Sequence, residues 1–513
     1  MQRITIWYKN TMTRCLHKIL RATFVLPFTA GLVKDRRNGS YTVHDGSISG
    51  VVLLTTIVII VVVTSIALPV NDSRYLMIGL LFLAIFSLIF CRVLVYFRSH
   101  WKYSRKPRVT DKLKIIFLWG FCIGNIVYLA TKLAVNIQCD QYPSLVEPIL
   151  YYIFIWVFDI SQTAFIHYFS RFRFASMTYF YYILMFMFVA NISAWTHRTI
   201  DMYNDDQMLT ILEQNQTDDT CNNKTTLHQT FTILKPFLEP LLLEYCLLCM
   251  IFISEMWPRH ITETKDQQDL HIYDSASYQQ SCENQPLLSS RPLTVSTQHH
   301  PTNKKSMCCV VFAILYTLSY SIIQCVFLYV DKLKPYQLVN SVYALFGNLV
   351  AISLLIKCFY ELSGQLQPKK TPRATMNMKH FIILTTSLAT CGFFIVQLIG
   401  AKYRDTWEDL NYVIRLAATI LQTTFILQMK QYRKCGNVNS YFTIRNVFSL
   451  VCILNFGIWF YYTFISAQHE FFHRHRHQMF DRQTILGVKH FWFPFVIFYH
   501  FECFLTFYRL FKE

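Results

Sequence analysis

The chain has few charged residues and few glycines. Of its 513 residues only 15% are Asp, Glu, Lys or Arg, and Gly occurs 14 times, whereas a soluble domain is typically about 25% charged and about 7% Gly. The shortage of charge excludes an ordinary soluble protein. The shortage of glycine leaves no Gly-rich loop for a carbonyl-lined ion filter. It also argues against the broken helices of carriers that move large solutes.

Enzyme signatures are missing as well. The sequence has no GxSxG, P-loop or dinucleotide-binding glycine pattern in a plausible context. We therefore expect no enzymatic activity and no cofactor, and no set of ligands clearly defines a metal site.

Apolar sequence is abundant instead, with 53% hydrophobic and 16% aromatic residues. Twelve apolar runs are each long enough to cross a bilayer core of about 30 Å as an α-helix. The sequence thus predicts an all-α integral membrane protein with twelve transmembrane helices. The expected spans are 48–69, 75–97, 113–135, 147–170, 177–197, 234–256, 307–330, 338–360, 380–401, 407–429, 444–466 and 489–511.

The net charge of +18 is distributed as membrane topology requires. Lys and Arg gather before the first span, between the second and third spans, and in further loops on that same side. Cytoplasmic loops of membrane proteins carry such an excess. We therefore expect cytoplasmic N- and C-termini and basic loops that face anionic lipid. No nucleic-acid partner is expected.

Three glycosylation sequons, which begin at Asn71, Asn215 and Asn223, fall in loops that this topology places outside the cell. The last two lie in a long acidic connection, about 198–233, which we expect to be a glycosylated surface loop. The sequence is thus that of a multi-pass protein of the plasma membrane.

Two cysteines, Cys139 and Cys221, lie in loops on the expected outer side. An oxidising exterior would let them form a disulfide. The sequence does not place their Cα atoms, so a disulfide and two free thiols remain alternatives.

A polar connection divides the chain into two halves. It is rich in Ser, Gln, Asp and Thr and lacks apolar periodicity, as a disordered linker does. Within it, Glu283–Leu288 fits an acidic dileucine pattern that would bind a sorting adaptor, or it is plain linker. The expected division is a cytoplasmic segment 1–47, a six-helix half 48–256, the cytoplasmic linker 257–306 and a second six-helix half 307–513.

The two halves repeat one another in sequence, as in many transport proteins. Six spans per half is an even number, so the repeats are expected to be parallel, related by an axis along the membrane normal. The matched segments are Gln162-Thr163-Ala164-Phe165 with Gln422-Thr423-Thr424-Phe425, Asn191-x-x-x-Trp195 with Asn455-x-x-x-Trp459, and Pro240-x-x-x-Glu244-Tyr245 with Pro494-x-x-x-Phe498-Tyr499.

Polar side chains inside the spans are candidates for a conduction path, because charge within a bilayer usually faces a bundle interior or water. Glu244 and Asp159 are expected to be relay or gating carboxylates, since an unpaired buried carboxylate is costly or takes up a proton. Gln162 and Gln422 would hold water or narrow the path. The other candidates are Asn191, Asn455, Tyr245, Glu239, His500, Glu502, Lys132 and Arg415.

Each candidate also has a purely structural interpretation. Gln or Asn in a membrane helix often joins two helices, at about 0.6–2 kcal/mol per hydrogen bond. Lys132, His500 and Glu502 would serve equally as members of structural ion pairs. The functional interpretation favours proton movement, because a proton needs only carboxylates, imidazoles, amides and ordered water within hydrogen-bond reach.

A histidine cluster lies between the last two expected spans, on the outer side. Imidazoles titrate near pH 6.5, so acid would concentrate positive charge there. Clustered histidines also bind Zn²⁺, and a solvated basic loop without a role is the third possibility. The cluster comprises His469, His473, His475 and His477.

The matched segments resemble the otopetrins, a family of acid-activated proton channels. The resemblance is carried by Phe237–Tyr245, Gln162–Phe165, Gln422–Phe425 and Pro494–Tyr499. It implies twelve helices in two six-helix halves, a homodimer, and proton paths within or between the halves. The site residues it implies are Gln162, Asn191, Glu244, Gln422 and Asn455.

We therefore expect a proton-selective channel that conducts H⁺ into the cell in response to extracellular acid. One alternative is a proton-coupled solute transporter, which would show saturable, substrate-dependent uptake. The other is a non-conducting sensory or scaffold subunit, which would show neither activity.

Overall fold

The computed structural model describes most of the helical part of the chain. The described residues are 32–34, 41–43, 70–97, 102–104, 109–138, 146–174, 178–215, 226–256, 334–363, 367–368, 378–400, 406–429, 432–433, 438–466 and 482–512, with isolated residues at 59, 63 and between 311 and 322.

Ten long helices run through these residues, five in each half. The N half contains α4 (Val70–Phe97), α5 (Val109–Gln138), α6 (Val146–Phe169), α7 (Thr178–Asn215) and α8 (Thr226–Met256). The C half contains α11 (Lys334–Ser363), α12 (Met378–Gly400), α13 (Thr406–Met429), α14 (Val438–Tyr461), which continues as the π-helical segment η3 (Tyr462–Ser466), and α16 (Arg482–Lys512).

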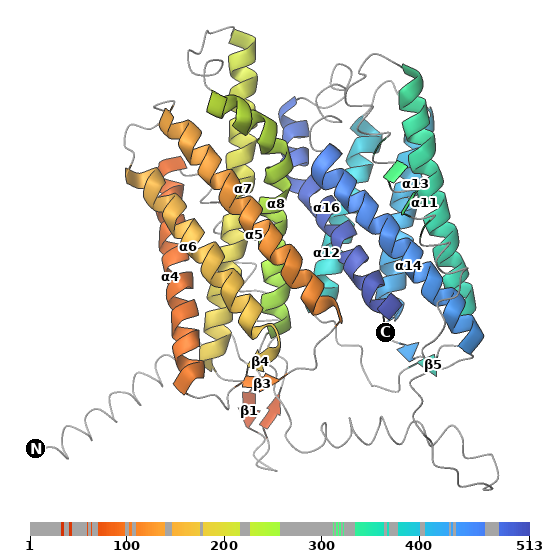
Figure 1. The fold of residues 1–513 in the computed structure, drawn as a ribbon, viewed down its shortest axis with the longest axis horizontal. Helices are drawn as coiled ribbons and strands as arrows, with labels where there is room; N and C mark the ends of the chain where they lie inside the picture. Colours follow the sequence, from red (N-terminus) through yellow and green to blue (C-terminus); the bar gives the residue numbers. More distant parts are fainter. Residues whose placement is uncertain are drawn as a thin grey trace, which may run out of the picture.

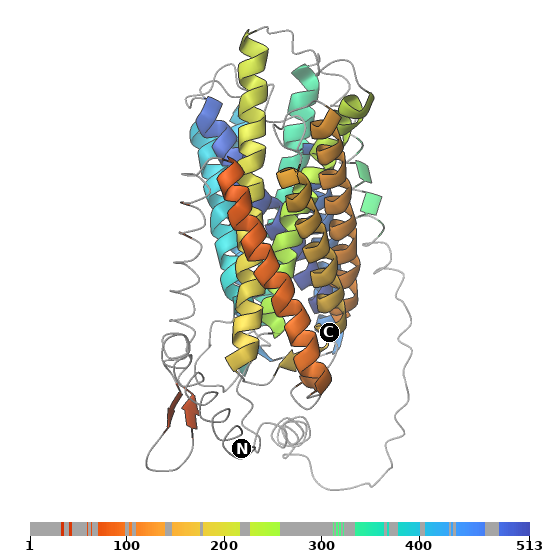
Figure 2. The ribbon, with the colours of Figure 1, turned by 90° about the vertical axis from the view of Figure 1, so that its left-hand side faces the viewer.

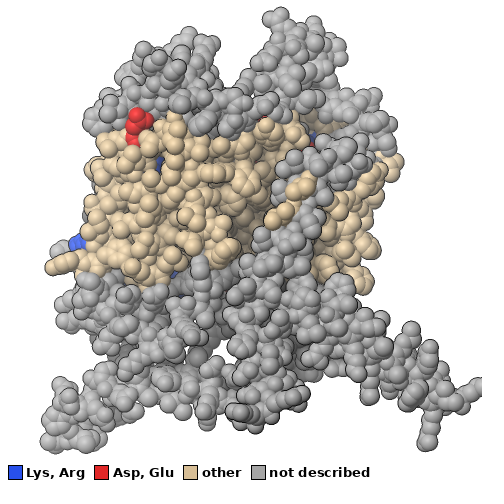
Figure 3. Space-filling view, turned by 180° about the vertical axis from the view of Figure 1, so that it is seen from behind, with Lys and Arg blue, Asp and Glu red and all other residues tan. Residues whose placement is uncertain are grey.

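Nine of the ten are long and apolar enough to cross a membrane, which confirms a multi-pass helical membrane protein. The exception is α7, whose second part carries charged residues. Large apolar side chains such as Phe86 and Ile89 on α4 are more than half exposed, as expected where lipid covers a helix. In the part described, the face in Figure 3 shows few charged residues. The expected spans 48–69 and 307–330 lie almost wholly outside the described residues, so the count of twelve stays a prediction.

The two halves stand side by side, and the helices of both run roughly along one direction (Figures 1 and 2). Helices α8 and α16 lie at the centre, whereas α4 and α6 flank one side and α11 and α13 the other. Across the boundary, α16 packs on α5, α7 and α8, and α8 packs on α12 and η3. We call this boundary the seam. The buried core is continuous through it and includes Tyr245, Trp459 and Phe501.

Short antiparallel ribbons repeat in equivalent connections of the two halves. Strands β3 (Lys102–Ser104) and β4 (Phe172–Phe174) pair the α4–α5 and α6–α7 connections. Strands β5 (Gln367–Pro368) and β6 (Tyr432–Arg433) pair the α11–α12 and α13–α14 connections. A third ribbon joins β1 (Leu32–Lys34) to β2 (Tyr41–Val43). The repeat expected from sequence is thus present in the fold.

The prediction of a long surface loop at 198–233 was wrong. Helix α7 continues to Asn215 and α8 already begins at Thr226. The hydropathy pattern ended the span at 197 because charged residues follow, but Arg198 is buried and paired, so the helix continues past it. Asn71 likewise lies in the first turn of α4 rather than in a loop.

Several predictions concern residues outside those described and stay predictions. They are the disulfide between Cys139 and Cys221, the sequon at Asn223, the dileucine pattern at Glu283–Leu288, and the cluster His469, His473, His475 and His477.

Candidate functional site

A pair of buried amides joins the equivalent helices of each half. In the N half, Gln162 on α6 and Asn191 on α7 exchange two hydrogen bonds of 2.9 and 3.0 Å. In the C half, Gln422 Nε2 on α13 donates to Asn455 Oδ1 on α14 at 2.9 Å. Both asparagines also donate to a backbone carbonyl four residues earlier. The amides therefore join helices, and the matched depth expected from sequence is observed.

The threonines that directly follow the two glutamines also make equivalent contacts in both halves. Thr163 Oγ1 lies 2.9 Å from the hydroxyl of Tyr245, which donates to the backbone carbonyl of Asp159 at 2.7 Å. Thr423 and Tyr499 make the same contact at 2.9 Å, and Tyr499 donates to the carbonyl of Thr419 at 3.0 Å. Thr419 therefore occupies in the C half the place that Asp159 occupies in the N half.

The N half carries a buried ion pair at this level. Arg198 Nη2 lies 3.1 Å from Asp159 Oδ2, and both side chains are almost fully buried. Asn125 of α5 donates to the same carboxylate oxygen, and Arg198 Nη1 lies 3.3 Å from Cys246 Sγ. Asp159 is thus held by a cation and an amide, and this ion pair is separate from the contacts of Glu244.

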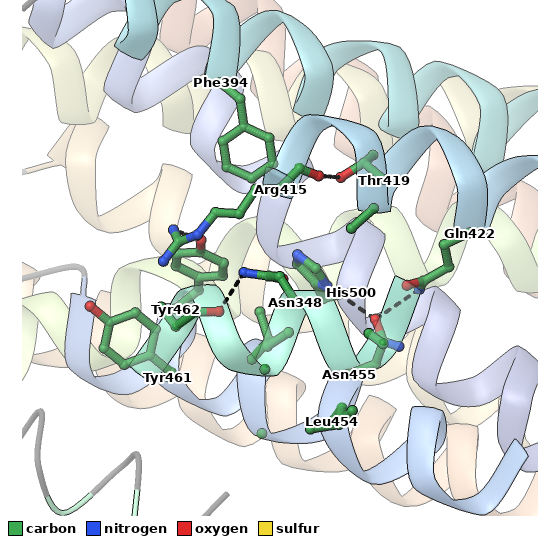
Figure 4. Close-up of a pocket in the computed structure, with 16 residues that line it drawn as sticks. Asn348, Phe394, Arg415, Thr419, Gln422, Leu454, Asn455, Tyr461, Tyr462 and His500 are labelled. Carbon is green, nitrogen blue, oxygen red and sulfur yellow. Dashed lines mark hydrogen bonds between the residues drawn. The ribbon is translucent and has the colours of Figure 1, made fainter. Parts of the chain in front are cut away.

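The C half contains a cavity at this level (Figure 4). Arg415 of α13 donates to the hydroxyl of Tyr462 at 2.6 Å, and His500 Nδ1 lies 3.1 Å from Asn455 Oδ1. Asn455 Nδ2 already donates to a carbonyl, so its Oδ1 accepts and His500 Nδ1 must carry a hydrogen. His500 and Arg415 thus belong to the C half rather than to the seam.

Glu244 lies in the seam and binds residues of the other half. Its Oε1 accepts from Trp459 Nε1 at 2.8 Å and from Thr463 Oγ1 at 3.2 Å. The carboxyl is fully buried, and within the described part of the chain its Oε2 has no hydrogen-bond partner and no basic side chain pairs with it. A buried carboxyl held only by neutral donors is the group whose charge is most costly here. It is therefore the carboxyl best suited to bind and release a proton.

One end of the seam carries a charged network. His490 Nε2 of α16 lies 2.9 Å from Asp206 Oδ2 of α7, and Lys235 of α8 lies 3.0 Å from the other oxygen of Asp206. Lys235 also lies 3.5 Å from Glu239, which accepts from Tyr128 at 3.4 Å. Glu239 therefore belongs to this network, and it precedes Glu244 by five residues along α8.

The opposite end of the seam carries a second group of charges. Lys114 of α5 lies 3.1 Å from Glu255 Oε1 of α8, with both side chains buried. The carboxyl of Glu502 on α16 interacts electrostatically with the same lysine. Titratable groups therefore lie at both ends of the seam, with Glu244 between them.

Sequence reasoning missed several of the residues that complete these contacts. Arg198 lay one residue beyond the end of the expected span, and Trp459 stood in a repeated motif but was not among the candidate residues. Lys132, a candidate, instead pairs with Asp201 at 2.6 Å in the N half, away from Glu244. Among the described residues no group of three potential ligands is placed to hold a metal ion.

The two amide pairs give a direct stability prediction. Asn455→Leu should lower the free energy of unfolding more than Asn191→Leu. It leaves two buried donors without an acceptor, Gln422 Nε2 and His500 Nδ1, whereas Asn191→Leu leaves one donor and one acceptor of Gln162, and a buried acceptor without a partner is tolerated more readily than a buried donor. Leaving a buried donor unsatisfied costs about 1–3 kcal/mol. Denaturant titration of the purified variants in micelles measures the difference. Equal losses would show that His500 gains nothing from Asn455.

The fold and these contacts define a multi-pass membrane protein with buried polar groups at matched depths in two halves. The model of the Otopetrin family matches residues 199–501, more than half of the chain. The chain therefore belongs to the otopetrin family, whose members are ion-transporting membrane proteins rather than enzymes. A comparison with the curated proteins finds no match.

Proposed function

We propose that this protein is a proton-selective channel that conducts H⁺ into the cell in response to extracellular acid, with Glu244 as the central proton relay. The observation that carries the proposal is the position of Glu244, which is fully buried between the halves and held by two neutral donors. Burial costs the neutral form of this carboxyl much less free energy than it costs the charged form. It can therefore take a proton from one end of the seam and release it toward the other.

The spacing along α8 supports a relay through water. At about 1.5 Å per residue, Glu239 lies about 8 Å and Glu255 about 16 Å from Glu244 along the helix axis. Such gaps are too long for direct transfer between side chains and need ordered water. The proposed path thus runs from the network of His490 and Asp206, past Glu244, to the group of Lys114, Glu255 and Glu502.

Aromatic rings close the second gap. Phe501 packs at 5.0 Å from Phe117, 5.7 Å from Phe121 and 5.5 Å from Trp459, measured between ring centroids. Closely packed rings would interrupt a continuous file of water. In this proposal they form the barrier that must loosen before protons pass, and they keep larger cations out.

The remaining features belong to the same proposal. The His490 end of the seam would face the exterior of the cell and the Lys512 end of α16 the cytoplasm, together with the N-terminus. The protein would act as a glycosylated homodimer in the plasma membrane. The amide pairs Gln162–Asn191 and Gln422–Asn455 would fix the helices on either side of the seam.

Proton flux into liposomes tests the proposal on the protein alone. The full chain is reconstituted with a trapped pH dye, the outside is acidified, and K⁺ with valinomycin holds the potential near zero. We expect internal acidification faster than in protein-free liposomes. Unchanged rates with correctly inserted protein would contradict conduction.

A smaller side chain in the aromatic barrier should ease conduction. Phe501→Leu removes a ring that contacts five other rings, so we expect more proton current at mild acidity than in the wild type. Phe425→Leu is the matched control, because Phe425 packs on Phe448 and Phe507 inside the C half. A current that rises equally in both variants would mean that the seam is not the barrier.

A further inference from the structure

Helix α5 exposes one continuous face beside α6, which packs against it (Figures 1 and 2). The face begins with Lys112 in the first turns of the helix and continues with Ile116, Trp119 and Ile123. These residues follow one another at intervals of four, three and four, so they lie on one side of the helix. Ile116 is 67% and Ile123 58% exposed. Because α5 is long and apolar enough to cross a membrane, we expect lipid to cover this face.

Two polar side chains meet on this face. Trp119 Nε1 donates to His167 Nδ1 of α6 at 3.1 Å. An indole nitrogen can only donate, so His167 Nδ1 accepts and the hydrogen of the neutral imidazole is on Nε2. His167 is exposed and lies in the last turn of α6, and among the described residues its Nε2 has no acceptor. A hydrocarbon chain cannot satisfy that donor, so the geometry favours an oxygen atom of the surrounding lipid.

Two exposed cations lie between this pair and the end of the bundle. Lys112 precedes Trp119 by seven residues, about 10 Å along the helix axis. Arg171 follows His167 by four residues. Within the described part of the chain neither cation is paired with a carboxylate. The carboxyl of Asp111, next to Lys112, is buried, so the exposed charge on this face is positive.

The order of these groups matches the layers of a membrane surface. They lie at the end of the bundle where α16 also ends (Figure 1), which faces the cytoplasm in the expected topology. A phospholipid there places its acyl chains deepest, then its ester carbonyls, and then its phosphate at the headgroup level. Ile123, then His167, then Lys112 and Arg171 follow in the same order. Two cations without a carboxylate favour an anionic lipid over a zwitterionic one, whose ammonium group they would repel.

We propose that this face of α5 and α6 binds one anionic phospholipid of the cytoplasmic leaflet. Lys112 and Arg171 bind its phosphate, His167 Nε2 donates to an ester carbonyl, and the acyl chains pack on Ile116 and Ile123. The lipid would thus join α5 to α6 on the outside of the N half. This inference does not depend on proton conduction.

Native mass spectrometry of the full chain in neutral detergent micelles tests the proposal. Phosphatidylglycerol is titrated against a constant excess of phosphatidylcholine, and the bound lipids are counted from the mass. We expect a saturable first binding step for phosphatidylglycerol that phosphatidylcholine does not suppress. Glycerol phosphate, which carries the phosphate without acyl chains, should not compete. No saturable step, or equal binding of the two lipids, would overturn the proposal.

Two double variants assign the binding to this face. Lys112→Gln with Arg171→Gln should weaken the first binding step at least about tenfold, a change of about 1.4 kcal/mol. Arg445→Gln with Lys512→Gln is the matched control. It removes two basic residues that both lie over Phe511, where α16 ends in the C half, and it should leave the first step unchanged. Equal losses in the two double variants would mean general attraction by positive charge and would contradict a site.

His167→Phe separates a built site from charge alone. It keeps a ring and both cations and removes the N–H donor, so we expect binding about threefold weaker, as for the loss of one hydrogen bond. Unchanged affinity in this variant would remove His167 and the proposed lipid position. The same spectra report the oligomeric state. A dimer lost in the Lys112→Gln, Arg171→Gln variant, with lipid binding intact, would assign the face to a second copy of the chain instead.

Discussion

Replacing Glu244 by Gln is expected to lower the proton current at least about tenfold, equivalent to about 1.4 kcal/mol of added barrier. The amide oxygen can still accept hydrogen bonds from Trp459 and Thr463, so the seam should stay assembled. What the amide cannot do is release a proton. The measurement is whole-cell current at acidic external pH, normalised to the protein at the cell surface.

Glu239→Gln is the matched control, because it makes the same substitution on the same helix within a network that has other charges. It should retain most of the current. Glu244→Asp keeps a carboxyl one methylene shorter and should restore measurable current relative to Glu244→Gln. Equal currents in Glu244→Gln and wild type, at equal surface expression, would remove Glu244 from the path.

The largest loss of stability is expected from Asp159→Asn. Breaking a buried ion pair by removing one partner costs about 3–5 kcal/mol, because the other charge stays buried. Arg198 cannot lose its proton, so Asp159→Asn should cost more than Arg198→Gln, after which Asp159 can take up a proton. Denaturant titration of purified variants in micelles gives the free energies of unfolding.

The double variant Asp159→Asn with Arg198→Gln separates pairing from simple loss of contacts. It should be more stable than Asp159→Asn alone, because no uncompensated charge remains. Lys132→Gln provides the control, since its partner Asp201 is 30% exposed and water can compensate the charge left behind. Additive losses in the double variant would show that the two side chains do not stabilise each other.

Much of the fold was predictable from the sequence because hydropathy and helix length leave few alternatives in a membrane. The spans expected at 147–170 and 407–429 agree with α6 and α13 to within one residue. The same rule failed at α7, where it assumed that a charged residue marks the end of a span. Arg198 violates that assumption because Asp159, on another helix, compensates its charge, and such compensation depends on tertiary contacts.

The candidate site was predictable only in part, for a related reason. Repetition identified Gln162, Asn191, Gln422 and Asn455, and each lies in the expected amide pair. Repetition could not show that Glu244 accepts a hydrogen bond from Trp459 of the other half. The repeat relates equivalent positions of the two halves, and it carries no information about which side chains meet between them. The absence of a basic partner for Glu244 among the described residues likewise emerged only from the packed seam.

In the proposed function, protons themselves carry current through this protein. Whole-cell recording in transfected cells tests it most directly, with external pH stepped from neutral to acidic and Na⁺ replaced by an impermeant cation. We expect an inward current whose reversal potential moves by about 59 mV for each unit of the pH gradient. A reversal potential that ignores the proton gradient, or no current despite confirmed surface expression, would contradict it.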